Sequence, residues 1–156
     1  MWKSREVGLE ELYLKEEIID LKILIMKHIE VVAAIIKNDD KILCVQRNEN
    51  KLSYISKKYE FPGGKMEPNE TKVETIVREI KEELSMDIIV KEEFLTITHQ
   101  YPDFLLTMHS FICNCNNRDL TLNEHIDYKW LEVDELDQLD WAAADIPIVD
   151  KLILNE

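Results

Sequence analysis

The feature that most constrains this chain is a set of fixed spacings, in which a glycine pair is followed by five charged residues. They are Gly63, Gly64, Glu70, Arg78, Glu79, Glu82 and Glu83. Residues 70–84 are predicted to form a helix, because apolar residues recur there at helical spacing, namely Val73, Ile76, Val77, Ile80 and Leu84. The glycine pair is expected to end a short strand at residues 59–61 in a turn.

Three of the glutamates share one face of this helix. Glu79, Glu82 and Glu83 stand at positions i, i+3 and i+4, roughly 120° from the apolar stripe. Their repulsion costs the helix roughly a few tenths of a kcal/mol per pair unless a cation lies between them. Carboxylates beside a phosphate substrate are the ligands that Mg²⁺ prefers. For these three residues alone, a solvated acidic face remains the other interpretation.

The balance of charge limits the partners of the chain. With 156 residues and 46% hydrophobic content, the chain suits one compact domain with its own core. A net charge of −13 repels the backbone of bulk nucleic acid, whereas divalent cations can bring a small phosphorylated ligand to an acidic site. We expect no membrane partner and a cytoplasmic protein, because the sequence has no long apolar run and no secretory signal.

The first 27 residues differ in pattern from the rest. Leu14, Ile18, Leu21 and Ile25 recur at spacings of four, three and four, which predicts an amphipathic helix. We expect an N-terminal helical extension at residues 1–27 and a second unit at residues 28–156. The extension either forms a dimerisation or packing helix or has no function, so the sequence is compatible with a monomer or a homodimer.

The remaining pattern predicts a mixture of strands and helices. Strands are expected at residues 28–36, 41–46, 59–61, 87–90, 95–99, 104–115 and 128–133, with helices near 134–139 and 146–154. Cys44, Cys113 and Cys115 are an odd number without paired ligand spacing, so reduced thiols are expected in preference to a zinc site.

The spaced residues from Gly64 to Glu83 resemble the Nudix box, the signature of the Nudix hydrolases. Ser85 stands where the family has glycine, at the end of the helix, where left-handed backbone is common. The stretches 30–36, 60–65 and 141–148 resemble the MutT-type and CTP pyrophosphohydrolase-like branch. The resemblance implies an α/β (α+β) fold, an α/β/α sandwich with a mixed β-sheet.

The resemblance also assigns roles to residues of the metal site. Glu79, Glu82 and Glu83 are expected to hold Mg²⁺, with Mn²⁺ as an alternative, and Glu124 from a late loop is expected to add a ligand. Gly63 is expected to bring its backbone close to the metal. Either Glu79 or Glu124 is expected to accept the proton of the attacking water.

Other positions are expected to bind substrate or to support the site. Arg47 matches a position that contacts the phosphate chain, and Gly64 and Phe61 are expected beside the substrate. Asp145 matches a position that faces the base. An ionised aspartate there accepts from the amine of cytosine, a protonated one can donate to an oxopurine, and capping of the last helix is a further interpretation. The pair of Glu70 and Arg78 is expected to be structural.

The implied reaction is Mg²⁺-dependent hydrolysis of a (deoxy)nucleoside triphosphate to the monophosphate and pyrophosphate. The expected base is that of CTP, a modified pyrimidine or 8-oxo-dGTP. Two alternatives remain, namely a Nudix hydrolase of ADP-ribose or a dinucleoside polyphosphate, and a non-catalytic Nudix module that senses a nucleotide. The intact set of Glu79, Glu82 and Glu83 argues against the non-catalytic module.

Overall fold

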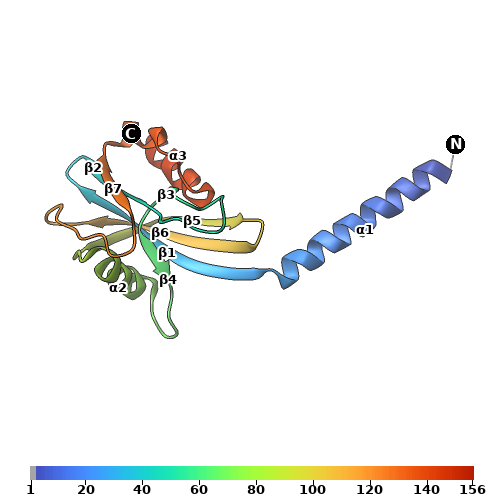
Figure 1. The fold of residues 1–156 in the computed structure, drawn as a ribbon, viewed down its shortest axis with the longest axis horizontal. Helices are drawn as coiled ribbons and strands as arrows, with labels where there is room; N and C mark the ends of the chain where they lie inside the picture. The colour runs from blue at the N-terminus through green and yellow to red at the C-terminus, as the bar shows by residue number, and fades with distance from the viewer. Residues whose placement is uncertain (1–2) are drawn as a thin grey trace.

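The computed structural model describes residues 3–156, which form a long N-terminal helix and a mixed sheet covered by helices on both faces (Figure 1). The strands are β1 (Lys27–Asn38), β2 (Lys41–Gln46), β3 (Tyr59–Glu60), β4 (Gly63–Lys65), β5 (Ile89–Gln100), β6 (Phe104–Asn114) and β7 (Asp127–Leu131). The α-helices are α1 (Lys3–Ile25), α2 (Lys72–Leu84) and α3 (Ile146–Leu154), and the short 3₁₀ helices are η1 (Val133–Gln138) and η2 (Ala143–Asp145).

The sheet is built around β1. Its strand order is β3-β2-β1-β6-β5, with β4 paired to β1 and β7 paired to β2. β1 is parallel to β6 and antiparallel to β2 and β4, so the sheet is mixed. Residues 32–36 of β1 are fully buried, which explains their uninterrupted apolar sequence, because a strand covered on both faces cannot alternate with polar residues.

Alternate residues of β1 belong to two separate cores. On one face, Val32 and Ile36 pack in a cluster with Ile80 of α2. On the other face, Ile35 packs in a cluster with Ile148 of α3. Helices therefore cover both faces of the sheet, and the predicted α/β/α sandwich with a mixed sheet is confirmed (Figure 1).

β5 corrects the prediction of two separate strands at residues 87–90 and 95–99. One strand, Ile89–Gln100, pairs with β6 and has register shifts between Val90 and Glu92 and between Glu93 and Leu95. The polar residues between the two predicted strands do not end the strand, because β5 lies at the edge of the sheet, where charged side chains face solvent.

α2 begins two residues later than predicted and buries a narrower stripe. Thr71 is the N-cap, and its side chain and that of Glu74 form a reciprocal capping box, so Lys72 is the first helical residue. Ile76, Ile80 and Leu84 are fully buried. Val73 and Val77 are 45% and 43% exposed, so the sheet contacts only one edge of the predicted apolar stripe.

α1 extends away from the sheet and the other helices (Figure 1). A helix was predicted in this part of the chain, but the prediction that it is amphipathic is wrong, because apolar side chains occur on all sides. Those more than half exposed are Leu9, Leu12, Tyr13, Leu14, Ile18, Ile19, Leu21, Leu24 and Ile25. Within residues 3–156, no helix combines the length and the apolar character that crossing a bilayer requires.

Candidate active site

The C-terminal end of α2 is formed by a residue in a left-handed conformation. Ser85 has φ 55° and ψ 32°, and its backbone N–H donates to the carbonyl of Lys81. This is the conformation for which glycine is the usual residue, because it has no β-carbon to strain. Ser85 therefore ends the helix with the geometry expected of the glycine that it replaces.

A loop between β6 and β7 docks on this end of α2. The backbone N–H of Asn123 donates to the carbonyl of Glu83 at 3.0 Å, and its side-chain amide donates to the carbonyl of Glu82 at 2.7 Å. These bonds satisfy carbonyl groups that a helix leaves free at its last turn. They fix Glu124, the next residue of the loop, beside the glutamates of α2.

Arg78 joins the loop before α2 to the carboxylates on the helix. Its guanidinium contacts both carboxylate oxygens of Glu70, at 2.6 and 2.8 Å, and also donates to Glu79 at 2.9 Å and Glu82 at 3.2 Å. A fifth contact reaches the carbonyl of Lys65 on β4 at 3.2 Å. The hydrogen bonds from Arg78 lower the pKa of Glu70 to about 2, so this pair stays ionised and holds the loop against the helix.

The two glycines are required by close packing within the protein. A β-carbon on Gly63 would overlap the carbonyl oxygen of Val32 on β1, and one on Gly64 would overlap the carboxylate of Glu79. A side chain at residue 63 would collide with backbone, whereas one at residue 64 would displace the carboxylate of Glu79. The neighbour of Gly64 is a glutamate of the predicted metal site.

Glu83 is a buried carboxyl group without a full set of partners. Its Oε2 atom is buried and accepts no hydrogen bond within the described chain. Burial, with repulsion from Glu124 and Glu79, raises its pKa to about 9, and the backbone N–H of Gly63 opposes the shift. A cation at this point would provide the missing partner and favour the ionised form, so the residues present fit a divalent metal.

The carboxylates of the predicted metal ligands lie farther apart than those of a second acidic group, at η1. Burial raises the pKa of Glu79, and its contact with Arg78 opposes that shift. The carboxylates of the described residues whose oxygens lie within 4.8 Å of one another are Glu132, Asp134 and Glu135 at η1. Lys41 contacts two of these three, at 3.2 and 3.6 Å, so a lysine already compensates that second group.

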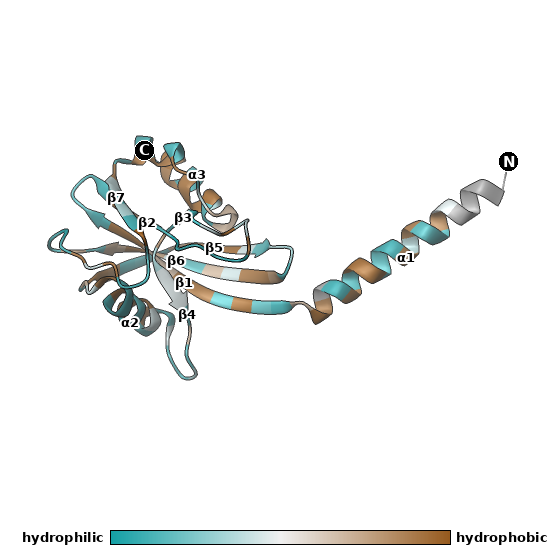
Figure 2. Cartoon of the chain, in the orientation of Figure 1, coloured by the Kyte–Doolittle hydropathy of each residue, from teal (hydrophilic) through white to brown (hydrophobic). Residues whose placement is uncertain are grey.

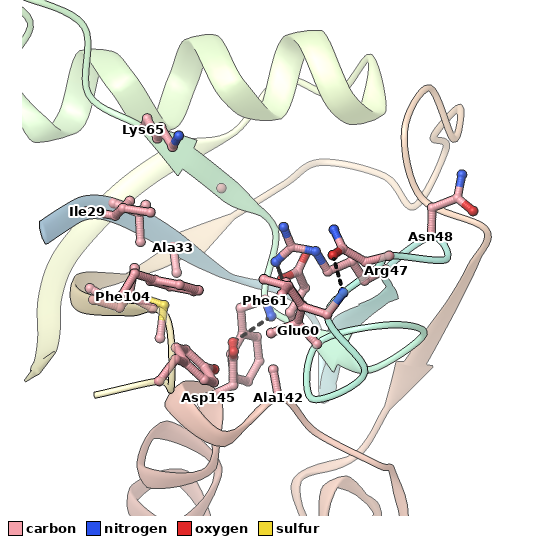
Figure 3. Close-up of a pocket in the computed structure, with 18 of the residues that line it drawn as sticks. Ile29, Ala33, Arg47, Asn48, Glu60, Phe61, Lys65, Phe104, Ala142 and Asp145 are labelled. Carbon is pink, nitrogen blue, oxygen red and sulfur yellow. Dashed lines mark hydrogen bonds and ion pairs between the residues drawn. The ribbon is translucent and has the colours of Figure 1, made fainter. Parts of the chain in front are cut away.

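A cavity of about 860 Å³ lies beside Glu83 and Glu124 (Figure 3). Of the predicted site residues, its lining includes Arg47, Phe61, Gly63, Glu83, Glu124 and Asp145. Among the described residues, Gly64, Glu79 and Glu82 do not contribute to the lining. The structure therefore brings the predicted phosphate-binding, base-binding and acidic positions to one cavity, with part of the acidic face of α2 outside it.

Asp145 does not cap α3. It precedes the helix, but its side chain makes no capping hydrogen bond. Instead, its Oδ1 atom accepts a hydrogen bond from the backbone N–H of Phe61 at 2.9 Å, and both residues line the cavity (Figure 3). Burial raises the pKa of Asp145 well above its ordinary value, and repulsion by Glu60 adds to this, whereas Phe61 N–H and Arg47 oppose it. Burial therefore favours the protonated form of this carboxyl group.

The wall beside Asp145 is aromatic. Phe61 stacks on Trp141 with ring centroids 4.7 Å apart. Tyr101 and Phe104 also line the cavity, and their rings are 4.9 Å apart. The hydroxyl of Tyr101 accepts the backbone N–H of Ala144 at 3.0 Å, which holds this ring against the segment that carries Asp145.

Sequence reasoning missed Glu60, which connects two other residues of the cavity. Its carboxylate contacts Arg47 at 3.4 Å and the Nε2 atom of His125 at 3.0 Å. His125, for which the sequence indicated no partner, is therefore held by Glu60, and its other ring nitrogen is buried without a partner among the described residues. The available signal was position alone, because Glu60 immediately precedes Phe61 and the glycine turn.

A mixed sheet between helices, with a glycine turn and an acidic helix beside a polar-lined cavity, defines the Nudix class of hydrolase. The NUDIX domain family model matches residues 31–151, so the chain belongs to the Nudix hydrolase family.

Individual relatives agree with the MutT-type and CTP pyrophosphohydrolase-like branch. A CTP pyrophosphohydrolase of Escherichia coli (strain K12) is 36% identical over 80% of this chain and 91% of its own length. An 8-oxo-dGTP diphosphatase of the same strain is 26% identical over 81% of this chain and 98% of its own length. A solution structure of the Nudix hydrolase MutT from methicillin-resistant Staphylococcus aureus is 41% identical, covers 85% of this chain and all of that one, and superimposes with a TM-score of 0.66.

Proposed function

We propose that this Nudix hydrolase cleaves a (deoxy)nucleoside triphosphate in the presence of Mg²⁺ to the monophosphate and pyrophosphate. The proposed base is cytosine, as in CTP or a modified pyrimidine nucleotide, or an oxidised guanine, as in 8-oxo-dGTP. The observation that carries this proposal is the buried Asp145, which lines the same cavity as Arg47, Glu83 and Glu124. The names of the relatives support the same substrate classes.

The protonated Asp145 explains why two such different bases fit one site. A neutral carboxyl group donates one hydrogen bond and accepts others. Cytosine presents an acceptor at N3 beside its amine donor, and 8-oxoguanine presents O6 as an acceptor beside a donor N–H at N7. Unmodified guanine presents two acceptors on that edge, O6 and N7. The aromatic side chains that line the cavity, Phe61, Tyr101 and Phe104, suit the flat face of either base.

The acidic residues are proposed to hold the metal. Glu79, Glu82 and Glu83 from α2 and Glu124 from the docked loop would bind Mg²⁺, with Mn²⁺ as an alternative. When bound, the ion supplies positive charge that offsets the phosphates and activates water for attack. The buried, unpartnered oxygen of Glu83 supports this assignment.

The chain's own residues bind the phosphates and receive the proton. Arg47 is 42% exposed at its side chain and makes only a 3.4 Å contact with Glu60, so its guanidinium is available to the phosphate chain. Glu79 already accepts a hydrogen bond from Arg78, whereas Glu124 is exposed. We therefore assign the base to Glu124: water attacks phosphorus, its proton passes to Glu124, and the P–O bond between the α- and β-phosphorus breaks, which gives the monophosphate and pyrophosphate.

The experiment is a substrate panel with product analysis. CTP, dCTP, 5-methyl-dCTP, 8-oxo-dGTP, dGTP and ADP-ribose are incubated with the protein and Mg²⁺, and pyrophosphate, phosphate and nucleotide products are separated. The proposal predicts pyrophosphate and monophosphate, with a higher kcat/KM for cytosine nucleotides or 8-oxo-dGTP than for dGTP. Turnover of ADP-ribose alone, release of phosphate alone, or no turnover would contradict it.

A further inference from the structure

Figure 2 shows hydrophobic residues, in brown, along α1, a helix that leaves the catalytic domain. Large apolar side chains of this helix are exposed to solvent. Leu14, Ile18, Leu21 and Ile25 are 57%, 52%, 59% and 76% exposed. A soluble protein rarely leaves so many apolar side chains uncovered over a continuous surface, and a helix of this length gains most of its stability from packing. We therefore expect this surface of α1 to pack against a partner.

The spacing of these four residues identifies the geometry of that partner. Steps of four, three and four residues place Leu14 and Leu21 at the d positions of a heptad and Ile18 and Ile25 at its a positions. Isoleucine at a together with leucine at d favours a parallel, two-stranded coiled coil. The stripe from Leu14 to Ile25 is thus complementary to another copy of itself, whereas the preceding a position is Glu11 and further apolar side chains of α1 lie outside the stripe.

The charges beside the stripe agree with this arrangement. Glu10 and Glu17 occupy g positions, and Lys15 and Lys22 occupy e positions. In a parallel pair, each g residue lies beside the e residue five positions further along the other helix, so both glutamates meet lysines. An antiparallel pair would place g beside g and e beside e, which brings like charges together.

We propose that α1 is a dimerisation helix, which forms a parallel, in-register, two-stranded coiled coil with a second copy of this chain. α1 leads into β1 after a single residue, Met26, so the coil places two catalytic domains at the same end of the dimer. Leu12 and Ile19 lie on the opposite side of α1 and stay outside this interface. Each catalytic site remains complete within one copy.

The first test compares two equivalent substitutions on the same helix in the full-length protein. Leu21→Lys places a charge in the interface, whereas Ile19→Lys places the same charge on the outer side. Sedimentation velocity and light scattering should give a dimer for wild type and Ile19→Lys and a monomer for Leu21→Lys, with unchanged kcat. A monomeric or tetrameric wild type, or loss of the dimer in Ile19→Lys alone, would overturn the proposal.

The second test uses the charged pairs to separate parallel pairing from nonspecific association. Glu17→Lys and Lys22→Glu each replace attraction by repulsion in two symmetric pairs, which should raise the dimer dissociation constant by about tenfold. An equimolar mixture of the two variants restores both attractions and should recover the wild-type affinity as a heterodimer. A mixture that associates no better than either variant would refute parallel, in-register pairing.

Discussion

Glu83, which belongs to the acidic cluster (Glu79, Glu82, Glu83 and Glu124), and Asp145 are two carboxyl groups buried beside one cavity in different surroundings. Glu83 has an oxygen without a partner and other carboxylates nearby, so repulsion adds to burial. Asp145 accepts a backbone N–H and has one acidic neighbour, Glu60, among the causes of its shift. Burial favours the protonated form of both groups, but a cation would ionise only the one that belongs to a cluster.

This difference indicates a division of work within the cavity. The acidic cluster becomes functional when positive charge arrives, and its carboxyl groups then act as ligands. Asp145 is functional in its neutral form, because a proton on its free oxygen allows it to donate to a base. Burial alone therefore does not determine the role of a carboxyl group, whereas its neighbours do.

The largest expected effect comes from Glu82→Gln. Glu82 is 56% exposed at its side chain, so the fold should be unaffected. Loss of a metal ligand should lower kcat/KM for every substrate by about 1000-fold, because charge stabilisation by the metal contributes several kcal/mol. Pyrophosphate release and circular dichroism would measure the two effects. Glu132→Gln, in the second acidic group at η1, is the matched control, and unchanged turnover in Glu82→Gln would refute the assigned metal site.

Asp145→Asn should change the choice of base more than the rate. Asparagine keeps a donor and an acceptor but fixes the donor as an amide, so the ratio of kcat/KM for CTP to that for dGTP should change by about 10-fold or more. Competition between the two nucleotides measures this ratio. Asp150→Asn, on the exposed side of α3, serves as the control. An equal loss for all bases would show that Asp145 acts only in folding.

Stability should depend on pH through Glu83 when no divalent metal is present. Its pKa is raised from 4.5 to about 9 in the folded protein, so the folded state retains a proton that the unfolded state loses. The contribution of Glu83 to the free energy of unfolding should therefore be fully present below pH 4.5 and fall as pH rises towards 9. The contribution is at most about 1.4 kcal/mol per pH unit. Urea unfolding in EDTA measures this slope, and Glu83→Gln should make it shallower; an unchanged slope would contradict the shift.

The smallest effect is expected at the end of α2. Ser85→Gly removes the strain of a left-handed serine and should stabilise the fold by about 0.5 to 1 kcal/mol. Part of the gain is offset because the Ser85 hydroxyl accepts a 3.3 Å hydrogen bond from Asn123. Thermal unfolding and kcat should be compared, with Asp87→Gly as a control outside the left-handed position. Destabilisation by Ser85→Gly would show that the hydroxyl matters more than the strain.

The sequence predicted the local parts of the site well. The resemblance to the Nudix box implied the pairing of Glu70 and Arg78, which lie close together along the chain on one loop and helix. Likewise, the left-handed turn at Ser85 follows from its place at the helix end. Sequence patterns that span about one helix therefore determine where the carboxylates of α2 lie relative to its apolar stripe.

Contacts between distant segments could not be predicted in this way. The bond between Asp145 and Phe61 joins residues 84 positions apart, and that between His125 and Glu60 joins residues 65 positions apart. Both depend on the packing of the sheet against η2 and the loop before β7, which no local spacing encodes. The same limit explains why capping of α3 by Asp145 was a reasonable but incorrect expectation.

Binding of Mg²⁺ by isothermal titration calorimetry at pH 7, in buffers of different ionisation enthalpy, tests the proposed division of work most directly. The account predicts that wild type and Asp145→Asn bind Mg²⁺ with release of a proton, because Glu83 must ionise to act as a ligand. Glu83→Gln should bind more weakly and release no proton. Proton release that persists in Glu83→Gln, or that disappears in Asp145→Asn, would contradict it.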